Sequence, residues 1–261
     1  MESNDIRMTE DAGVLTVTFT RDAKLNAVSP DMIDVLRDAA TQLEDRYDLR
    51  VLLITGEGRY FTAGIDIAHL KGRAPDEDGK VRTSSIRRER RKLHRLFDQL
   101  ESIEKPVVLA AQGPCLGFGM EMACSVDFRL ASERTNFGLP EVVNLAVLPG
   151  AGGINRFTRL VGPHWSRYVN MANKRIDAHL ARQIGFVHEV YADDEFAERA
   201  RQFCRDLVAL PGEAIGLAKI AIEAAASMTD RAAARDVDRI ANSLLLTTDE
   251  HAEALARFRA K

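Results

Sequence analysis

The sequence is poor in the features that mark exported and membrane proteins. It has only three cysteines in 261 residues, namely Cys115, Cys124 and Cys204, and none of them forms a CxxC pair. They are too few and too widely spaced for a disulfide framework, so we expect a reducing compartment and a cytoplasmic location. Residues 1–13 are acidic, and no run approaches 18 apolar residues. We therefore expect neither a signal peptide nor a membrane-spanning helix.

An excess of charge of one sign is also missing. The chain has 36 Lys plus Arg and 39 Asp plus Glu, which gives a net charge of −3. A dedicated nucleic-acid binder usually carries a basic domain, so we expect no nucleic-acid partner. The fractions of hydrophobic residues (46%) and charged residues (29%) are typical of a folded globular chain. The length fits one large domain or a domain with an appendage.

Several motifs of catalysis and cofactor binding are absent. Gly56 and Gly58 lack the third glycine of a dinucleotide-binding loop, and so do Gly150 and Gly152. The chain contains no GxxxxGK[ST], no GxSxG and no HExxH. Its six histidines show no ligand spacing. We therefore predict no metal site.

Hydrophobic patterns predict alternating strands and helices. Residues 14–19 alternate apolar and polar side chains, as a half-buried strand does, and residues 51–55 and 107–111 are apolar runs typical of buried strands. Ser29 as a cap before Pro30 predicts the start of a helix. Residues 86–102 carry apolar side chains at helical spacing. This alternation predicts an α/β fold.

The remaining patterns complete the predicted architecture. We predict an apolar helix over 118–124, short strands near 127–130 and 135–137, and a mobile polar loop over 71–85. From about residue 194 the pattern is almost entirely helical and rich in alanine. The expected organisation is a core over residues 1–195, followed by a helical region over residues 196–261.

Two glycine-containing segments each follow a predicted buried strand. They are FTAGIDI at 61–67 and GPCLGFGME at 113–121, and a third segment, FGLPE at 137–141, carries a second carboxylate. With Leu25-Asn-Ala27 and PGAGGINRFTRLVG at 149–162, they occur in an order and spacing that resembles the crotonase (enoyl-CoA hydratase/isomerase) superfamily. The resemblance covers nearly the whole chain.

The resemblance implies a fold and an activity. The expected fold is a spiral of ββα units with a helical C-terminal region that packs in a homotrimer, often paired into a homohexamer. Members bind acyl-CoA thioesters and stabilise a thioester enolate. Coenzyme A is then part of the substrate, and no separate cofactor is expected.

The resemblance also implies catalytic roles for four residues. The backbone N–H groups of Ala63 and Phe118 would form an oxyanion hole for the thioester oxygen. Glu121 and Glu141 would act jointly as acid and base, with Glu141 favoured as the proton donor to Cα. Two carboxyl groups facing one water repel each other, which separates their pKa values and lets one keep a proton.

The resemblance implies that further residues contact the substrate. For some other residues, two interpretations stay open. The expected substrate-binding residues are Leu25, Ala27, Ala63, Gly64, Ile65, Asp66, Phe118, Pro149 and Gly150. Asp66 fits equally well as a purely structural cap. The basic run 87–92 is by default a solvated helix face, with a phosphate contact as the alternative. Leu93 and Phe97 are either plain core or part of the acyl pocket.

The sequence departs from the family pattern at four places. Phe118 stands where glycine is usual, so its side chain must point away from the ligand or intrude on the pocket. Ala68 replaces a common lysine. The segment 142–148 is one residue longer than is typical, which predicts a local bulge or a rotation of Glu141. The residues from 250 onward lack the usual glycine and the Glu-Lys-Arg signature.

These observations lead to a main hypothesis and two alternatives. The main hypothesis is an enoyl-CoA hydratase that adds water in syn fashion across a 2-enoyl thioester. It depends on the presence of both carboxylates, since related isomerases often keep only the second. The first alternative is another crotonase-type reaction, such as isomerisation, decarboxylation or thioester hydrolysis. The second is a CoA-binding protein with little catalysis.

Overall fold

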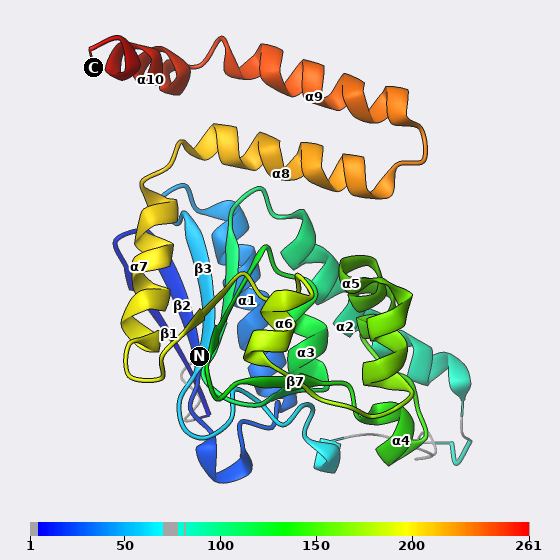
Figure 1. Ribbon diagram of the computed structural model, residues 1–261. Helices are drawn as coiled ribbons and strands as arrows, with labels where there is room; N and C mark the ends of the chain where they lie inside the picture. Colours follow the sequence, from blue (N-terminus) through cyan, green and yellow to red (C-terminus); the bar gives the residue numbers. More distant parts are fainter. Residues whose placement is uncertain (1–4, 70–77, 81, 261) are drawn as a thin grey trace.

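A layer of C-terminal helices lies above an α/β core in the computed structural model of the chain (Figure 1). The structure describes residues 5–69, 78–80 and 82–260. Part of the predicted loop 71–85 lies outside these residues. Within the described part, the α/β class with a helical C-terminal region is confirmed.

Two sheets organise the strands. The larger sheet has the order β1-β2-β3-β4-β6-β9, with β1 and β2 antiparallel and the other neighbours parallel. A smaller sheet has the order β5-β7-β8. The strands are β1 (Ile6–Asp11), β2 (Val14–Phe19), β3 (Val51–Gly56), β4 (Val107–Ala111), β5 (Cys115–Leu116), β6 (Phe128–Ser132), β7 (Asn136–Gly138), β8 (Ile176–Asp177) and β9 (Glu189–Tyr191).

The sequence patterns did not predict β1. Ile6 is the only buried residue of this edge strand, so its pattern carries little hydrophobic signal. The strand forms because Ala12 and Gly13 both have positive φ (44° and 84°), which folds β1 back onto β2 as a tight hairpin.

The helices confirm the predicted apolar faces and the predicted start of the first helix. Ser29 caps the first helix, because its Oγ accepts from the Met32 N–H at 3.4 Å. The second helix begins within the predicted loop, at Thr83. The helices are α1 (Pro30–Asp45), α2 (Thr83–Ser102), α3 (Phe118–Ala123), α4 (Glu141–Leu145), α5 (Gly153–Asn170), α6 (Ala178–Gln183), α7 (Phe196–Val208), α8 (Gly212–Ser227), α9 (Arg231–Leu245) and α10 (Asp249–Arg259).

Both faces of the larger sheet are covered. Alternate residues of β3 point to opposite sides, so Leu52 and Ile54 join the main core while Val51 and Leu53 pack beneath α7. Burial on both faces explains why the parallel strands are continuous apolar runs. The first helix of the expected C-terminal region, α7, therefore belongs to the core, and the helices beyond the sheet are α8, α9 and α10 (Figure 1).

The helix α8 is tied to the core by a lysine. Lys219 Nζ lies 2.8 Å from the Asp127 carboxylate and donates to the Leu100 carbonyl at 3.1 Å. Farther out, α9 and α10 carry exposed apolar side chains, including Ile240 (58% exposed), Leu244 (54%) and Phe258 (79%). Among the described residues, no helix is both long enough and apolar enough to cross a membrane.

Candidate active site

The glycine segments that the sequence singled out lie against one another. The Leu116 N–H donates to the Thr62 carbonyl at 3.0 Å, and the Gly117 N–H donates to the Gly138 carbonyl at 2.9 Å. A Cβ atom added to Gly64, which has φ +104°, would lie 3.6 Å from the Phe118 nitrogen. The segment 61–66, the start of α3 and the end of β7 therefore meet at one place.

The structure corrects the expected pair of backbone donors. The Ala63 N–H is already used, because it donates to the Leu25 carbonyl at 2.9 Å. Two residues on, Asp66 N–H donates to the Val28 carbonyl at 2.9 Å, and Val28 N–H donates to the Gly64 carbonyl at 2.9 Å. Because successive peptides of an extended segment point to opposite sides, the Ile65 N–H points away from Val28.

The Ile65 and Phe118 N–H groups are donors left over at this junction. Neither donates to any acceptor among the described residues. Phe118 is the first residue of α3, where an N–H has no partner within the helix. In the sequence, Ile65 and Phe118 are marked by the glycine that precedes each of them. Gly64 and Gly117 both have positive φ, a conformation that glycine adopts readily.

The Phe118 side chain is part of the core. It is 2% exposed, and its ring centroid lies 5.0 Å from that of Phe97 on α2. Of the two expected orientations, the ring therefore points into the packing between α2 and α3 and leaves the backbone N–H uncovered. Phe97 is itself fully buried in the main core, and Leu93 packs against the same cluster.

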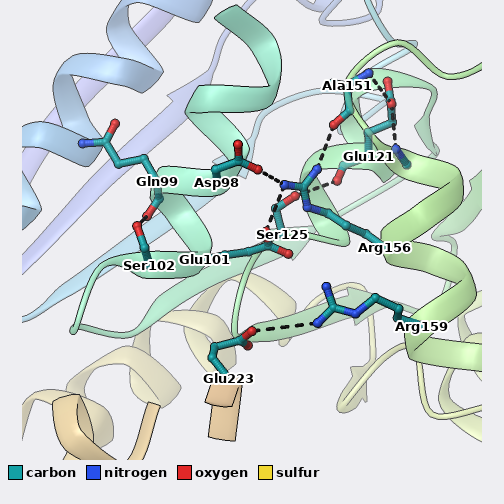
Figure 2. A network of polar contacts seen from close by, with 11 residues as sticks. Asp98, Gln99, Glu101, Ser102, Glu121, Ser125, Ala151, Arg156, Arg159 and Glu223 are labelled. Carbon is teal, nitrogen blue, oxygen red and sulfur yellow. Dashed lines mark hydrogen bonds and ion pairs between the residues drawn. The ribbon is translucent and has the colours of Figure 1, made fainter. Parts of the chain in front are cut away.

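Glu121 is a buried carboxyl held by backbone. It is 3% exposed, and its Oε1 accepts from the N–H groups of Ala151 at 2.7 Å and Gly153 at 3.0 Å (Figure 2). Burial raises the pKa of Glu121, while these two bonds and the nearby Arg90 and His94 oppose that rise. The carboxyl group is therefore fixed in place by the loop 149–153.

An arginine on α5 stabilises the loop 149–153. Arg156 on α5 donates to the Ala151 carbonyl at 2.8 Å, so the residue whose N–H holds Glu121 is itself held through its carbonyl (Figure 2). The guanidinium also pairs with Asp98 and, at 2.9 Å, with Glu101 on α2. Its side chain is only 8% exposed. The sequence analysis did not identify Arg156, since its role depends on partners on α2 and on the loop before α5.

Glu141 approaches from a different element. It begins α4, directly after Pro140, and a Cβ atom added to Gly117 would lie 2.8 Å from its Oε1. Its Oε2 is buried and has no hydrogen-bond partner among the described residues. Burial first, and then repulsion by Glu121, raise the pKa of Glu141 to about 7.

The segment after Glu141 forms the short helix α4, which ends at Leu145 with Ala146 as its cap. Ala146 has φ 53°, a left-handed conformation that is uncommon for a residue with a side chain. The Val147 N–H then donates back to the Glu141 carbonyl at 3.3 Å. The local bulge and the rotation of Glu141 that the length of residues 142–148 suggested both stay predictions.

The residues expected to contact coenzyme A form one backbone assembly. Leu25 and Ala27 adjoin the segment 63–66 through the Leu25 carbonyl and a bridge between Val28 and Ile65. Asp66 has the structural role that the sequence left open, because it pairs with Arg21 at 2.7 Å and accepts from the Ala68 N–H at 3.0 Å. Its contact with coenzyme A stays a prediction.

Pro149 and Gly150 lie at the start of the loop that holds Glu121. Pro149 is buried, and the guanidinium of Arg90 covers Gly150. Most of the basic run 87–92 is an exposed helix face, as the default interpretation predicted, and Arg90 is the half-buried exception. Within the described part of the chain, no group of three or more His, Cys, Asp or Glu residues is arranged to hold a metal ion.

Comparisons with known proteins agree with this geometry. The family model for enoyl-CoA hydratase/isomerase matches residues 9–261. The chain is 32% identical over 223 residues to the short-chain-enoyl-CoA hydratase of Clostridium acetobutylicum, which covers 85% of this chain and 82% of that protein. It is 31% identical over 262 residues to the crotonyl-CoA hydratase of Syntrophomonas wolfei, covering 100% and 97% of the two chains.

A solved structure extends the likeness to the fold. The crystal structure of an enoyl-CoA hydratase from Bacillus anthracis aligns with a TM-score of 0.88 at 26% identity, over 98% of this chain and 96% of that one. The chain therefore belongs to the enoyl-CoA hydratase/isomerase family, the crotonase superfamily. It is a hydratase-like enzyme with the crotonase fold, as the resemblance of its sequence implied.

Proposed function

We propose that the protein is an enoyl-CoA hydratase, which adds water in syn fashion across the α,β double bond of a 2-enoyl-CoA thioester. One observation carries the proposal: the buried carboxyl group of Glu121 and the buried Oε2 of Glu141 come from different elements, and they flank a junction where two backbone N–H groups have no partner among the described residues. This arrangement supplies an acid, a base and an oxyanion hole at one place. The hydratase names of relatives at about 30% identity support the same activity.

The backbone donors would act on the thioester oxygen. In the proposed mechanism, the N–H groups of Ile65 and Phe118 bind this oxygen, where negative charge gathers as the enolate forms. Ile65 takes the place expected for Ala63, whose N–H is bonded to Leu25. The loss of one such donor typically costs about 2.7–4 kcal/mol of barrier.

The two glutamates would divide the proton transfers. Glu121, whose Oε1 is fixed by two N–H groups, takes a proton from water as the water oxygen bonds to Cβ. Glu141, with its pKa raised to about 7, gives its proton to Cα. Both act from the same side of the double bond, which gives syn addition and a 3-hydroxyacyl-CoA product.

The test is turnover of crotonyl-CoA, followed by loss of the enoyl-thioester absorbance. We expect hydration by the native protein and a loss of about 10²–10⁴-fold in kcat for Glu121→Gln and for Glu141→Gln. Glu133→Gln is the matched control, since Glu133 is an exposed residue away from the site. Binding of crotonyl-CoA without hydration would overturn the proposal and direct the search to isomerisation, decarboxylation and thioester hydrolysis.

The proposal also covers the substrate, the cofactor requirement, the oligomeric state and the location of the enzyme. The substrate is an acyl-CoA, and no separate cofactor is needed because general acid–base chemistry and an oxyanion hole suffice. We further propose a homotrimer or homohexamer, supported by the exposed apolar side chains of α9 and α10. The cytoplasmic location stays a prediction, supported by three cysteines that are all free and buried.

A further inference from the structure

An arginine that has no ion-pair partner in the part of the chain that the structure describes lies beside the loop that holds Glu121. Arg90 is half-buried on α2, and a Cβ atom added to Gly150 would lie 2.9 Å from its Nη1. Among the described residues it forms no ion pair, whereas Lys92 on the next turn pairs with Glu89. The guanidinium of Arg90 therefore lies against Gly150, and no described carboxylate pairs with it.

A histidine extends the same face of α2. His94 follows Arg90 by four residues, which places both side chains on one side of the helix. A Cβ atom added to Gly152 would lie 3.2 Å from His94 Cε1. The two side chains thus lie along the loop from Gly150 to Gly152, one helical turn apart.

The other charged groups around this loop already have partners. Glu121 accepts two backbone N–H bonds, and Arg156 is bonded to Asp98 and Glu101 (Figure 2). Arg90 is near enough to Glu121 to oppose the rise in its pKa that burial causes. No described residue uses the side-chain donors of Arg90, so we take them as available to a ligand that reaches the loop.

An alkyl chain would be a poor occupant of this place. It would strip water from the guanidinium and return no hydrogen bond, which is costly for a charged group. A carboxylate would accept paired N–H bonds from an arginine in a fixed fork geometry. The chemistry beside the loop therefore favours an anionic group.

We propose that Arg90, assisted by His94, binds a carboxylate on the acyl group, so that the substrate is a 2-enoyl-CoA with a negatively charged acyl end. This inference rests on the proposed function. Glu121 works at Cβ in that mechanism, and its carboxyl group is held by the loop that Arg90 and His94 border. A substituent that extends from Cβ past this loop meets the two side chains.

The test compares two substrates of similar length, 4-carboxybut-2-enoyl-CoA and hex-2-enoyl-CoA. We expect kcat/KM to be at least about tenfold higher for the carboxylated ester, through a lower KM. Arg90→Gln should remove most of this preference, and His94→Gln part of it. Arg91→Gln, which changes an exposed arginine on the same helix, should leave the preference intact.

Three results would overturn the inference. They are equal or better use of the uncharged ester by the native protein, an unchanged preference in Arg90→Gln, and an equal rise in KM for both esters in that variant. The last result would mean that Arg90 contacts coenzyme A. If neither ester is hydrated, equilibrium binding of both esters still decides: selective binding of the carboxylated ester supports this inference while the hydratase proposal fails.

Discussion

At the scale of single residues, the two site glutamates differ in how their oxygens are satisfied. Glu121 Oε1 accepts two backbone N–H bonds, whereas Glu141 Oε2 is buried without a partner. Hydrogen bonds to a carboxylate favour its charged form, and burial without them favours the neutral form. Burial raises the pKa of both side chains, and the two N–H bonds oppose that rise at Glu121. In the proposed mechanism this difference suits Glu121 to act as the base and Glu141 as the acid.

This difference predicts the pH dependence of the reaction. The pKa of Glu141 is raised from 4.5 to about 7, so the group keeps its proton below that pH and loses it as the pH rises through about 7. If the protonated form gives its proton to Cα, kcat/KM for crotonyl-CoA should fall above about pH 7. Initial rates between about pH 5.5 and pH 9 check this, and a flat profile across that range would contradict it.

Arg156 is expected to position Glu121 and not to contact the substrate. Arg156→Lys keeps the charge but replaces the planar fork that bonds the Ala151 carbonyl and the two carboxylates by one compact ammonium group. We expect kcat to fall, by up to about 100-fold, with little change in KM, because a small displacement of a catalytic group is costly. Steady-state kinetics on crotonyl-CoA measure the two constants separately.

A neighbouring arginine supplies the control for that variant. Arg159 lies on the same helix, and its side chain is 47% exposed in a pair with Glu223 at 3.9 Å (Figure 2). Exposed pairs contribute little, so Arg159→Lys should leave kcat unchanged. A rise in KM with unchanged kcat in Arg156→Lys would show that Arg156 binds substrate instead.

At the scale of elements, short segments with special backbone geometry bring the site together. Gly117 lies between β5 and α3 with φ 53° and ψ −120°, a conformation that favours glycine. The turn sends the Phe118 N–H toward Gly64 and leaves room for the Glu141 carboxyl. A strand, a turn and a helix therefore cooperate to present one backbone donor.

The variant Gly117→Ala should damage both stability and activity. Its new Cβ would meet Glu141 Oε1 at 2.8 Å, in addition to the backbone strain of a positive φ. We expect a loss of about 1–2 kcal/mol in the free energy of unfolding from the strain. We also expect a large loss of kcat from displacement of Glu141. Denaturant unfolding and kinetics check the two effects.

The control has the same strain without the collision. Gly185 has φ +80°, and nothing lies within 4 Å of an added Cβ atom. Gly185→Ala should lose similar stability and keep its kcat. Equal kcat values for the two variants would contradict the proposed place of Gly117 beside the reacting carboxyl.

At the scale of the whole molecule, the chain has a packed core and an extension with unpaired apolar side chains. The helix α7 covers one face of the larger sheet, while α8 is attached by Lys219 and α9 lies farther out (Figure 1). Ile240 and Leu244 lie one turn apart on α9 and are more than half exposed. Such a surface is typical of an interface between subunits.

We expect this surface to hold the proposed trimer or hexamer together. Ile240→Asp combined with Leu244→Asp should lower the mass measured by sedimentation, because charged groups cannot be buried unpaired at an interface. Asn242→Asp adds a charge to an exposed position on the same helix and should leave the assembly intact. A monomeric native protein would contradict the expectation.

The sequence by itself determined the features that depend on local spacing. Alternation and apolar runs predicted β2, β3 and β4, and the Ser29 cap predicted the start of α1. Glu121 and Glu141 were identified from their glycine and proline neighbours and the family resemblance. Each of these signals lies within a few residues of the feature that it marks.

Only the tertiary structure decided the features that depend on distant partners. Ala63 lost its expected role because its N–H bonds a carbonyl 38 positions earlier, at Leu25, which leaves Ile65 as the free donor. The supporting role of Arg156 became evident only in the structure, because α2 and the loop before α5 meet around its guanidinium. A hydrogen bond uses up a donor wherever its acceptor lies in the chain, so the choice of free donors and supporting charges is made by packing and not by local spacing.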